Sequence, residues 1–348
     1  MTNILKELVA INTVKDLENN KIREYIKTLL LPLNFSFEEI GNNDKKILIA
    51  KRGKSNIGFV CHTDTVDFSS QWTEPPFTLT QKNKKLYGLG VADMKGGIAA
   101  LLKALLEIDI SYPCTCYFTY DEEIGFEGIK NLIKEKKDFP PILIFTEPTD
   151  NIPIIANKGC LEFKVIFNGK SAHSSTPMLG DNAIYKAICF IDELKIFSDK
   201  LKDEQNTIYD IPYTTFNLAK IEGGNAINKV ADNCQIYFDF RTVSKKQEIE
   251  ISTKLKDLAK KYKAKVEILN NVSCAKCETK EFQNKIESIC NAKCSGLNYV
   301  TEASFFNNKN ILILGPGPVT AHQKNEYIYL ESFKKTIEIY KKIIIELS

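Results

Sequence analysis

Two of the three histidines, with several acidic residues, stand where they could bind metal ions. His62 follows an apolar run at 57–61, typical of a buried β-strand, and Asp64 lies two residues further on. Open α/β sheets bind ligands at the carboxyl ends of their strands, where this pattern places His62. A nearby carboxylate can fix the tautomer of an imidazole and raise its basicity as a metal ligand. A single core or surface histidine is the simpler interpretation of His62 alone, so the case for a metal depends on the rest of the chain.

Further candidate ligands follow predicted strands or precede a predicted helix. They are Asp93, Glu122, Glu123, Glu147 and His322. All of them can lie on one rim of one sheet. Two histidines with three carboxylates suit a pair of Zn²⁺ ions, one carboxylate bridging the two. Each ion would keep a position for water, which a two-metal centre can convert to hydroxide near neutral pH.

The consecutive pair Glu122 and Glu123 follows a predicted strand at 114–120. Neighbouring side chains at the end of a strand point in different directions. One of the two can therefore bind metal while the other faces the water as a general base. The alternative interpretation is an exposed acidic turn. The other candidate ligands favour the metal site over this alternative.

Composition limits the classes of protein that fit. The chain has 348 residues, enough for about two domains, and 47 basic against 44 acidic side chains give a net charge of +3 without a basic patch that would indicate nucleic acid. The N-terminus lacks a basic segment followed by an apolar core, and no stretch has the roughly 18 apolar residues of a membrane span. We therefore expect a cytoplasmic protein without nucleic-acid or membrane partners.

The order of predicted elements indicates two domains. Strands alternate with helices through residue 150, which predicts an α/β fold with a mostly parallel sheet flanked by helices. The pattern then changes to alternating, half-buried strands with two helices, which predicts a small α+β sandwich. The α/β character resumes from residue 281 onward, so the simplest topology is one domain inserted into another.

Four of the ten cysteines form two short-spaced pairs: Cys274 with Cys277, and Cys290 with Cys294. Paired spacings of this kind can hold a structural zinc ion. However, 281–290 resembles an ordinary amphipathic helix, and only the second pair has a glycine close behind it. We favour free, reduced thiols, which are usual in the cytosol.

Five motifs together resemble the dizinc amidohydrolase family that includes acetylornithine deacetylase, succinyl-diaminopimelate desuccinylase and glutamate carboxypeptidase. The motifs are His62-Thr63-Asp64, Gly90-Val91-Ala92-Asp93-Met94-Lys95-Gly96-Gly97, Asp121-Glu122-Glu123, Glu147-Pro148-Thr149 and Ala321-His322. The resemblance implies a discontinuous catalytic domain at 1–159 and 272–348. It also implies an inserted lid and dimerisation domain at 160–271.

The resemblance assigns a role to each candidate. It implies two Zn²⁺ per subunit, with Co²⁺ as a possible substitute, and makes Asp93 the bridging ligand. His62 and Glu147 would complete one site, and Glu123 and His322 the other. Glu122 would be the general base, and Asp64 would orient His62.

Three residues of the inserted domain also match family positions. His173 resembles the lid histidine that reaches the partner subunit's active site and stabilises the oxyanion, which implies a homodimer. Arg241 resembles the arginine that binds the substrate α-carboxylate; a solvated surface arginine is the alternative. Asn228 matches the oxyanion-loop asparagine, although Ala231 stands where the family often has proline.

The segments at 301–306, 315–317 and 321–327 resemble acetylornithine deacetylase more than the desuccinylase. They imply hydrolysis of N-acetyl-ornithine to ornithine and acetate, a step of arginine biosynthesis. A desuccinylase, a deacylase of N-acyl-lysine or N-acyl-citrulline, and a dipeptidase remain open with the same centre. A catalytically silent zinc-binding scaffold is the alternative from another class, but it would be expected to lack Glu122 or a ligand.

Overall fold

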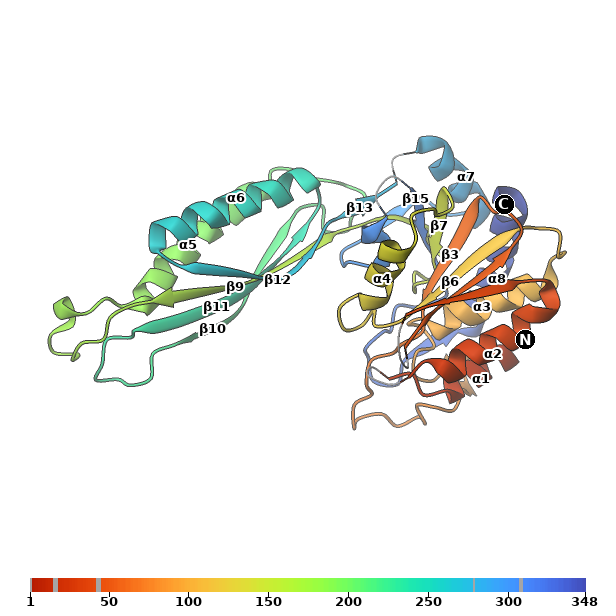
Figure 1. Ribbon diagram of the computed structural model, residues 1–348, viewed down its shortest axis with the longest axis horizontal. Coiled ribbons are helices and arrows are strands. Elements are labelled where there is room, and N and C mark those ends of the chain that lie inside the picture. The colour runs from red at the N-terminus through yellow and green to blue at the C-terminus, as the bar shows by residue number, and fades with distance from the viewer. Residues whose placement is uncertain (1, 15–17, 42–44, 278, 307–308) are drawn as a thin grey trace. The chain divides into compact units, whose positions relative to one another are not determined.

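The computed structural model describes residues 2–14, 18–41, 45–277, 279–306 and 309–348 (Figure 1). The chain divides into two compact units. Unit 1 contains Met1–Ile155, Lys276–Ser295 and Phe305–Ser348, and unit 2 contains Ala156–Ala275 and Gly296–Ser304. Unit 2 includes Gly296–Ser304, whereas the division expected from sequence assigns 272–348, and with it this segment, to the catalytic domain. Within unit 2, the side chain of Asn157 donates a hydrogen bond to Ser304 Oγ at 2.7 Å.

Unit 1 is built on a mixed sheet whose central strands are parallel. Strand β3 (Ile57–His62) pairs in parallel with β6 (Cys114–Thr119) and β7 (Ile142–Phe145), and β15 (Asn310–Ile313) pairs in parallel with β7. The strand order is β1 (Ser36–Ile40), β2 (Ile47–Arg52), β6 (Cys114–Thr119), β3 (Ile57–His62), β7 (Ile142–Phe145), β15 (Asn310–Ile313), β8 (Ile154–Asn157) and β13 (Ala275–Lys276), with β14 (Ser295–Leu297) on β8. All six residues of β3 are buried, as expected for a strand covered on both faces.

Helices cover this sheet: α1 (Asn3–Ala10), α2 (Asn20–Leu30), α3 (Lys95–Glu107), α4 (Glu127–Glu135), α7 (Lys280–Cys290) and α8 (Leu330–Leu347). Helix α3 packs against α1 and α8, while α4 packs against β1 and β6 (Figure 1). The sheet with its flanking helices confirms the predicted α/β class. A short 3₁₀ helix, η1 (Leu31–Leu33), follows α2.

A second, three-stranded sheet of unit 1 joins distant parts of the sequence. Its order is β16 (Tyr327–Tyr329), β5 (Lys85–Tyr87) and β4 (Thr80–Lys82). Tyr327 pairs with Tyr87 in the antiparallel register. This pairing brings the chain that follows His322 beside the chain that leads to Asp93.

Unit 2 is a four-stranded antiparallel sheet with two helices on one face. The sheet order is β10 (Thr215–Gly223), β11 (Asn233–Thr242), β9 (Gly159–Asn168) and β12 (Lys265–Val272), and the helices are α5 (Ala183–Leu201) and α6 (Lys245–Tyr262). Burial alternates along β9 and β11 because one face packs on the helices. Helix α5 extends to Leu201, whose side chain packs into the core between the helices and the sheet. Two 3₁₀ helices, η2 (Pro177–Leu179) and η3 (Glu302–Phe305), complete the elements.

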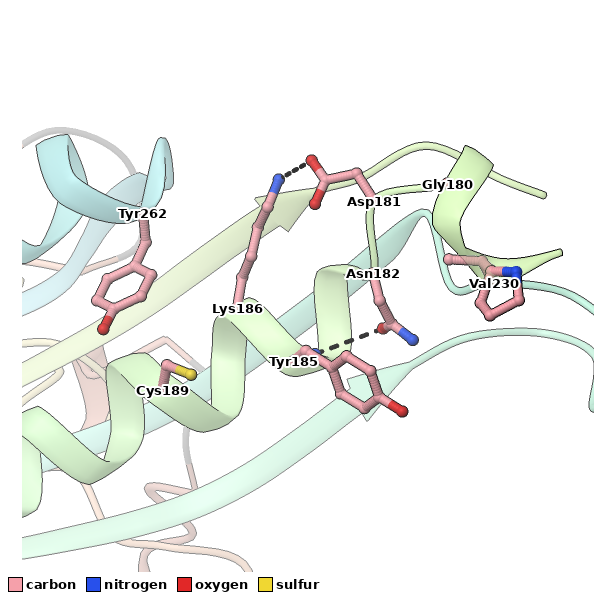
Figure 2. A pocket seen from close by; sticks show the side chains of 9 residues that line it. Gly180, Asp181, Asn182, Tyr185, Lys186, Cys189, Val230 and Tyr262 are labelled. Atoms are coloured by element: carbon pink, nitrogen blue, oxygen red, sulfur yellow. Dashed lines mark hydrogen bonds and ion pairs between the residues drawn. The ribbon is translucent and has the colours of Figure 1, made fainter. Parts of the chain in front are cut away.

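A surface pocket of about 440 Å³ lies along the first turns of α5 (Figure 2). Three of its polar side chains already have partners within the chain. Lys186 forms an ion pair with Asp181, and the side chain of Asn182 accepts hydrogen bonds from the amides at the start of the helix. None of the candidate site residues lines this pocket.

Among the described residues, no helix has both the length and the apolar composition required to cross a membrane. No disulfide joins cysteines of the described residues. Burial raises the pKa of both Cys274 and Cys290 to about 12. In the described part of the chain, no cysteine belongs to a group of side chains spaced to hold a metal ion.

Candidate metal centre

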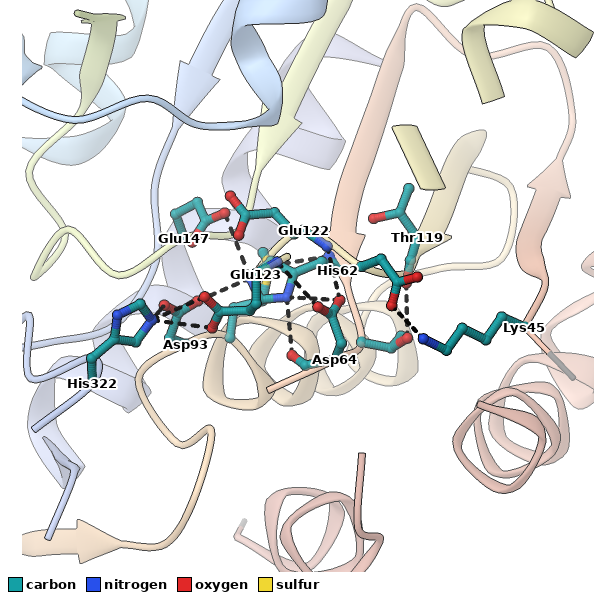
Figure 3. Close-up of polar contacts among 12 residues, drawn as sticks. Lys45, His62, Asp64, Asp93, Thr119, Glu122, Glu123, Glu147 and His322 are labelled. Carbon is teal, nitrogen blue, oxygen red and sulfur yellow. Dashed lines mark hydrogen bonds and ion pairs between the residues drawn. The ribbon is translucent and has the colours of Figure 1, made fainter. Parts of the chain in front are cut away.

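Five side chains of unit 1 converge into two groups that share one residue (Figure 3). In the first group, His62 Nε2 lies 2.9 Å from Asp93 Oδ1 and 3.8 Å from Glu147 Oε1. In the second, His322 Nε2 lies 3.0 Å from Glu123 Oε2 and 3.6 Å from Asp93 Oδ2. Asp93 thus presents one oxygen to each group, which is the geometry of a bridging carboxylate.

The topology of the sheet explains why these residues meet. His62 ends β3, while Glu123 and Glu147 follow β6 and β7, and these three strands are parallel neighbours. Their carboxyl ends therefore lie along one edge of the sheet. Asp93 stands two residues before α3, and His322 lies in the loop between β15 and β16.

Asp64 supports both His62 and the turn that carries the two glutamates. His62 Nδ1 lies 3.1 Å from the backbone carbonyl oxygen of Asp64; with Nε2 as a metal ligand, Nδ1 would carry the proton and donate it to this carbonyl. The Asp64 carboxylate lies slightly further from Nδ1, at 3.5 Å. It also accepts hydrogen bonds from the amides of Glu122 and Glu123, at 3.3 and 3.2 Å. The carbonyl as the nearer partner of His62 is a detail that the sequence did not predict.

The electrostatics of the centre favour a cation. Burial raises the pKa of Glu122 well above its ordinary value, and the charges of Glu147, Glu123 and Asp93 raise it further. Burial also raises the pKa of Glu123, although its hydrogen bond with His322 opposes the shift. Carboxylates at such close range repel one another, and divalent cations relieve that repulsion. Oxygen and imidazole nitrogen donors are ligands that Zn²⁺ accepts, so the residues present fit a two-metal centre.

Both histidines have neighbouring carboxylates that favour their charged form. The hydrogen bond that His322 donates to Glu123 raises the pKa of His322 to about 9, against the effect of burial. Burial alone would lower the pKa of His62, but Asp64 and Asp93 raise it well above its ordinary value. Metal binding requires neutral imidazoles, so loading the centre is expected to release protons.

His173, Asn228 and Arg241 lie in unit 2, and two of them are neighbours. The side chain of His173 is exposed, and its Nδ1 lies 2.7 Å from Ser175 Oγ. The amide of Ser174 donates to the carbonyl of Asn228 at 3.1 Å, which places the histidine beside the asparagine. Arg241 lies toward the other end of β11, where its Nε donates to Asp239 Oδ1 at 3.1 Å.

One residue of the centre had no predicted role. Glu326, in the loop after His322, is buried against the backbone before α3. In the sequence it stands in the polar run at 323–326, which is typical of an exposed loop. No local pattern distinguishes it from a solvated acid.

The family model of peptidase family M20/M25/M40 matches residues 58–346. The chain belongs to this family. Among curated relatives, acetylornithine deacetylase of Buchnera aphidicola is 34% identical, and the match covers 98% of this chain and 96% of the relative. Acetylornithine deacetylase of Pasteurella multocida is 32% identical, with 94% and 91% covered. The predicted family is thereby confirmed, and this member of peptidase family M20/M25/M40 is a metal-dependent amidohydrolase.

Solved structures of the same fold extend over nearly the whole chain. Aminopeptidase PepT of Bacillus cereus has a TM-score of 0.79 at 22% identity, with 99% of this chain and 97% of that chain covered. The YXEP protein of Bacillus subtilis, described as a dinuclear metal-binding peptidase of the M20 family, has a TM-score of 0.73 at 11% identity, with 99% and 97% covered. These likenesses confirm the fold class.

Proposed function

We propose that this chain hydrolyses the amide bond of an N-acyl amino acid, with N-acetyl-ornithine as the substrate and ornithine and acetate as the products. This reaction would place it in arginine biosynthesis. The observation that carries the proposal is the pair of ligand groups sharing Asp93, with Glu122 beside them but in neither group. The acetylornithine deacetylases at 32–34% identity over nearly their full lengths support the choice of substrate.

In the proposed mechanism, each residue has a separate task. His62, Asp93 and Glu147 would hold one ion, and Asp93, Glu123 and His322 the other; we expect Zn²⁺, with Co²⁺ as a substitute. When bound, such ions activate water and polarise an amide carbonyl. Glu122 accepts a proton from the attacking water and returns it to the leaving amine.

The substrate is tested by measuring amine release from the metal-loaded protein. N-acetyl-ornithine, N-succinyl-diaminopimelate, N-acetyl-lysine, N-acetyl-citrulline and a dipeptide are compared at equal concentration, with Glu122→Gln as the blank. We expect the highest kcat/KM for N-acetyl-ornithine. A higher kcat/KM for the succinyl compound or for the dipeptide would agree with the proposed mechanism but would identify a different substrate. Equal release by the variant would contradict both.

We further propose that the protein works as a homodimer through unit 2, with His173 and Asn228 supplied by the partner. Strand β10 is an edge strand of the sheet in this unit. The unit also exposes large apolar side chains, namely Met178, Leu179, Tyr185, Ile188, Ile221 and Ile227. Exposed apolar residues beside an open strand edge are typical of a pairing surface.

The spacing within unit 2 supports the same arrangement. Strand β11 pairs Asn233 with Asn168 and Arg241 with Cys160. The two pairs are eight residue steps apart along the strand, about 26 Å at the usual rise per residue. His173 and Asn228 lie beyond the Asn233 end. A small amino-acid derivative cannot reach Arg241 and His173 of one chain, so contacts to both require two chains.

Mixing two inactive variants tests this proposal. Glu122→Gln lacks the base, and His173→Ala lacks the oxyanion donor, so each homodimer is expected to lose most of its activity. Mixed dimers would contain one site with Glu122 of one chain and His173 of the other. We expect activity to return after the variants are unfolded together and refolded. No recovery, with dimers present by light scattering, would place His173 in its own chain's site or outside the mechanism.

A further inference from the structure

Glu326 contacts the backbone that carries the shared ligand. Its Oε2 accepts a hydrogen bond from the amide of Gly90 at 2.8 Å, and its Oε1 accepts from the amides of Ala92 and Asp93 at 2.6 and 3.0 Å. The residue is only 2% exposed. We propose that Glu326 is a positioning residue, which holds Asp93 where it can serve both metal ions.

The number of donors explains why a carboxylate is needed. Three buried amides point at one side chain, and the carboxyl group of Glu326 offers two oxygens that accept from them. A conformation that buries backbone amides without a hydrogen-bond acceptor is destabilised. Without Glu326, the segment Gly90–Asp93 would therefore favour a conformation in which its amides reach water.

The loop around Asp93 has little other freedom. Gly90 has a φ of +78°, and a Cβ atom there would lie 2.7 Å from Thr65 Cγ2. A Cβ atom on Gly96 would lie 2.2 Å from the carbonyl oxygen of Val91. The backbone therefore passes close to its neighbours on both sides of Asp93. The amide of Asp93 itself is held by Glu326, so this bond acts directly on the orientation of the ligand.

Glu326 also links the two ligand groups. It lies four residues after His322, which belongs to the second group, and it binds the segment of Asp93, which belongs to both. It is in neither group among the described residues, because its oxygens are directed at the amides. Its influence on the ions would therefore pass through Asp93. Partners that orient a metal ligand typically change metal affinity 10–100-fold when they are replaced.

The neighbouring residue provides a matched control. Asn325 also makes three hydrogen bonds from the same loop, but to a different segment. Its Oδ1 accepts from the amides of Thr73 and Glu74 at 2.8 and 3.0 Å, and its Nδ2 donates to Thr73 Oγ1 at 2.6 Å. Replacing Asn325 removes as many bonds as replacing Glu326 but leaves the Asp93 segment untouched.

The test measures Zn²⁺ affinity of the metal-free full-length chain by competition with a chromophoric chelator. Glu326→Gln keeps the size of the side chain but turns an NH₂ group toward an amide that needs an acceptor. We expect both zinc equivalents to bind about 10–100-fold more weakly. The zinc affinity of Asn325→Ala should stay within about twofold of the wild-type value. Glu326→Asp keeps both oxygens on a shorter side chain, so its zinc affinity should lie between those of Glu326→Gln and wild type. This variant takes the place of Glu326→Gln if the glutamine variant does not fold.

Wild-type zinc affinity in Glu326→Gln, or an equal loss in Asn325→Ala, would overturn the proposal. A lower melting temperature of the metal-free variant without a change in zinc affinity would also overturn it, since that is the result for a purely structural residue. The inference rests on the proposed metal centre but not on the substrate. The experiment measures zinc binding alone, so its result could be interpreted even if the protein did not cleave N-acetyl-ornithine.

Discussion

Replacing Glu122 by glutamine is expected to lower kcat for the cleaved N-acyl substrate by about 10²–10⁴-fold, the usual contribution of a positioned acid–base group. The burial and neighbouring carboxylates that raise the pKa of Glu122 make it a better proton acceptor than an ordinary glutamate. Glutamine keeps the shape of the side chain but can neither accept the proton from water nor return it to the amine. KM should change little, because Glu122 is not proposed to bind the ground-state substrate.

The metal content of the same samples decides what the loss means. Glu122 is in neither ligand group, so the variant should still bind two metal ions. Asp121→Asn provides the control, because it makes the same chemical change one residue earlier, where the carboxylate binds Lys45 Nζ at 2.7 Å. We expect that control to keep kcat within about threefold, as for most substitutions outside a catalytic centre. Loss of one metal from Glu122→Gln would instead make Glu122 a ligand.

Replacing Asp93 by alanine is expected to weaken the binding of both metal ions together. Its two oxygens face different groups, so one substitution removes a ligand from each. We expect a loss of at least about 100-fold for both equivalents, since even the partners of ligands change affinity by 10–100-fold. His322→Ala should affect only the second group and leave one equivalent bound near its wild-type affinity.

Thermal unfolding with and without a chelator gives a second readout. A ligand that binds only the native state stabilises it, so removing the ions should lower the melting temperature of the wild type. The same chelator should scarcely change the melting temperature of Asp93→Ala. If Asp93→Ala still bound one ion tightly, Asp93 would belong to a single site and the centre would not be bridged.

The sequence by itself determined the α/β class and the family, both of which the structure and the comparisons confirm. The periodicity of a buried strand such as β3 depends on residues close together in the chain, and so does the alternation along β9. The candidate ligands were also visible, because each follows a predicted strand or begins a predicted helix. Parallel strands place their carboxyl ends together, so that position alone predicts proximity.

The tertiary structure decided which atoms face one another. That Asp93 offers one oxygen to each group depends on side-chain orientations across five separate segments. The role of Glu326 was equally hidden, because it pairs with amides more than 230 residues away in the chain. The separation of Arg241 from His173 within unit 2 follows from the register of β9 and β11. Such contacts are set by long-range pairing, whereas the patterns readable from sequence reflect only the local preference of each segment for helix or strand.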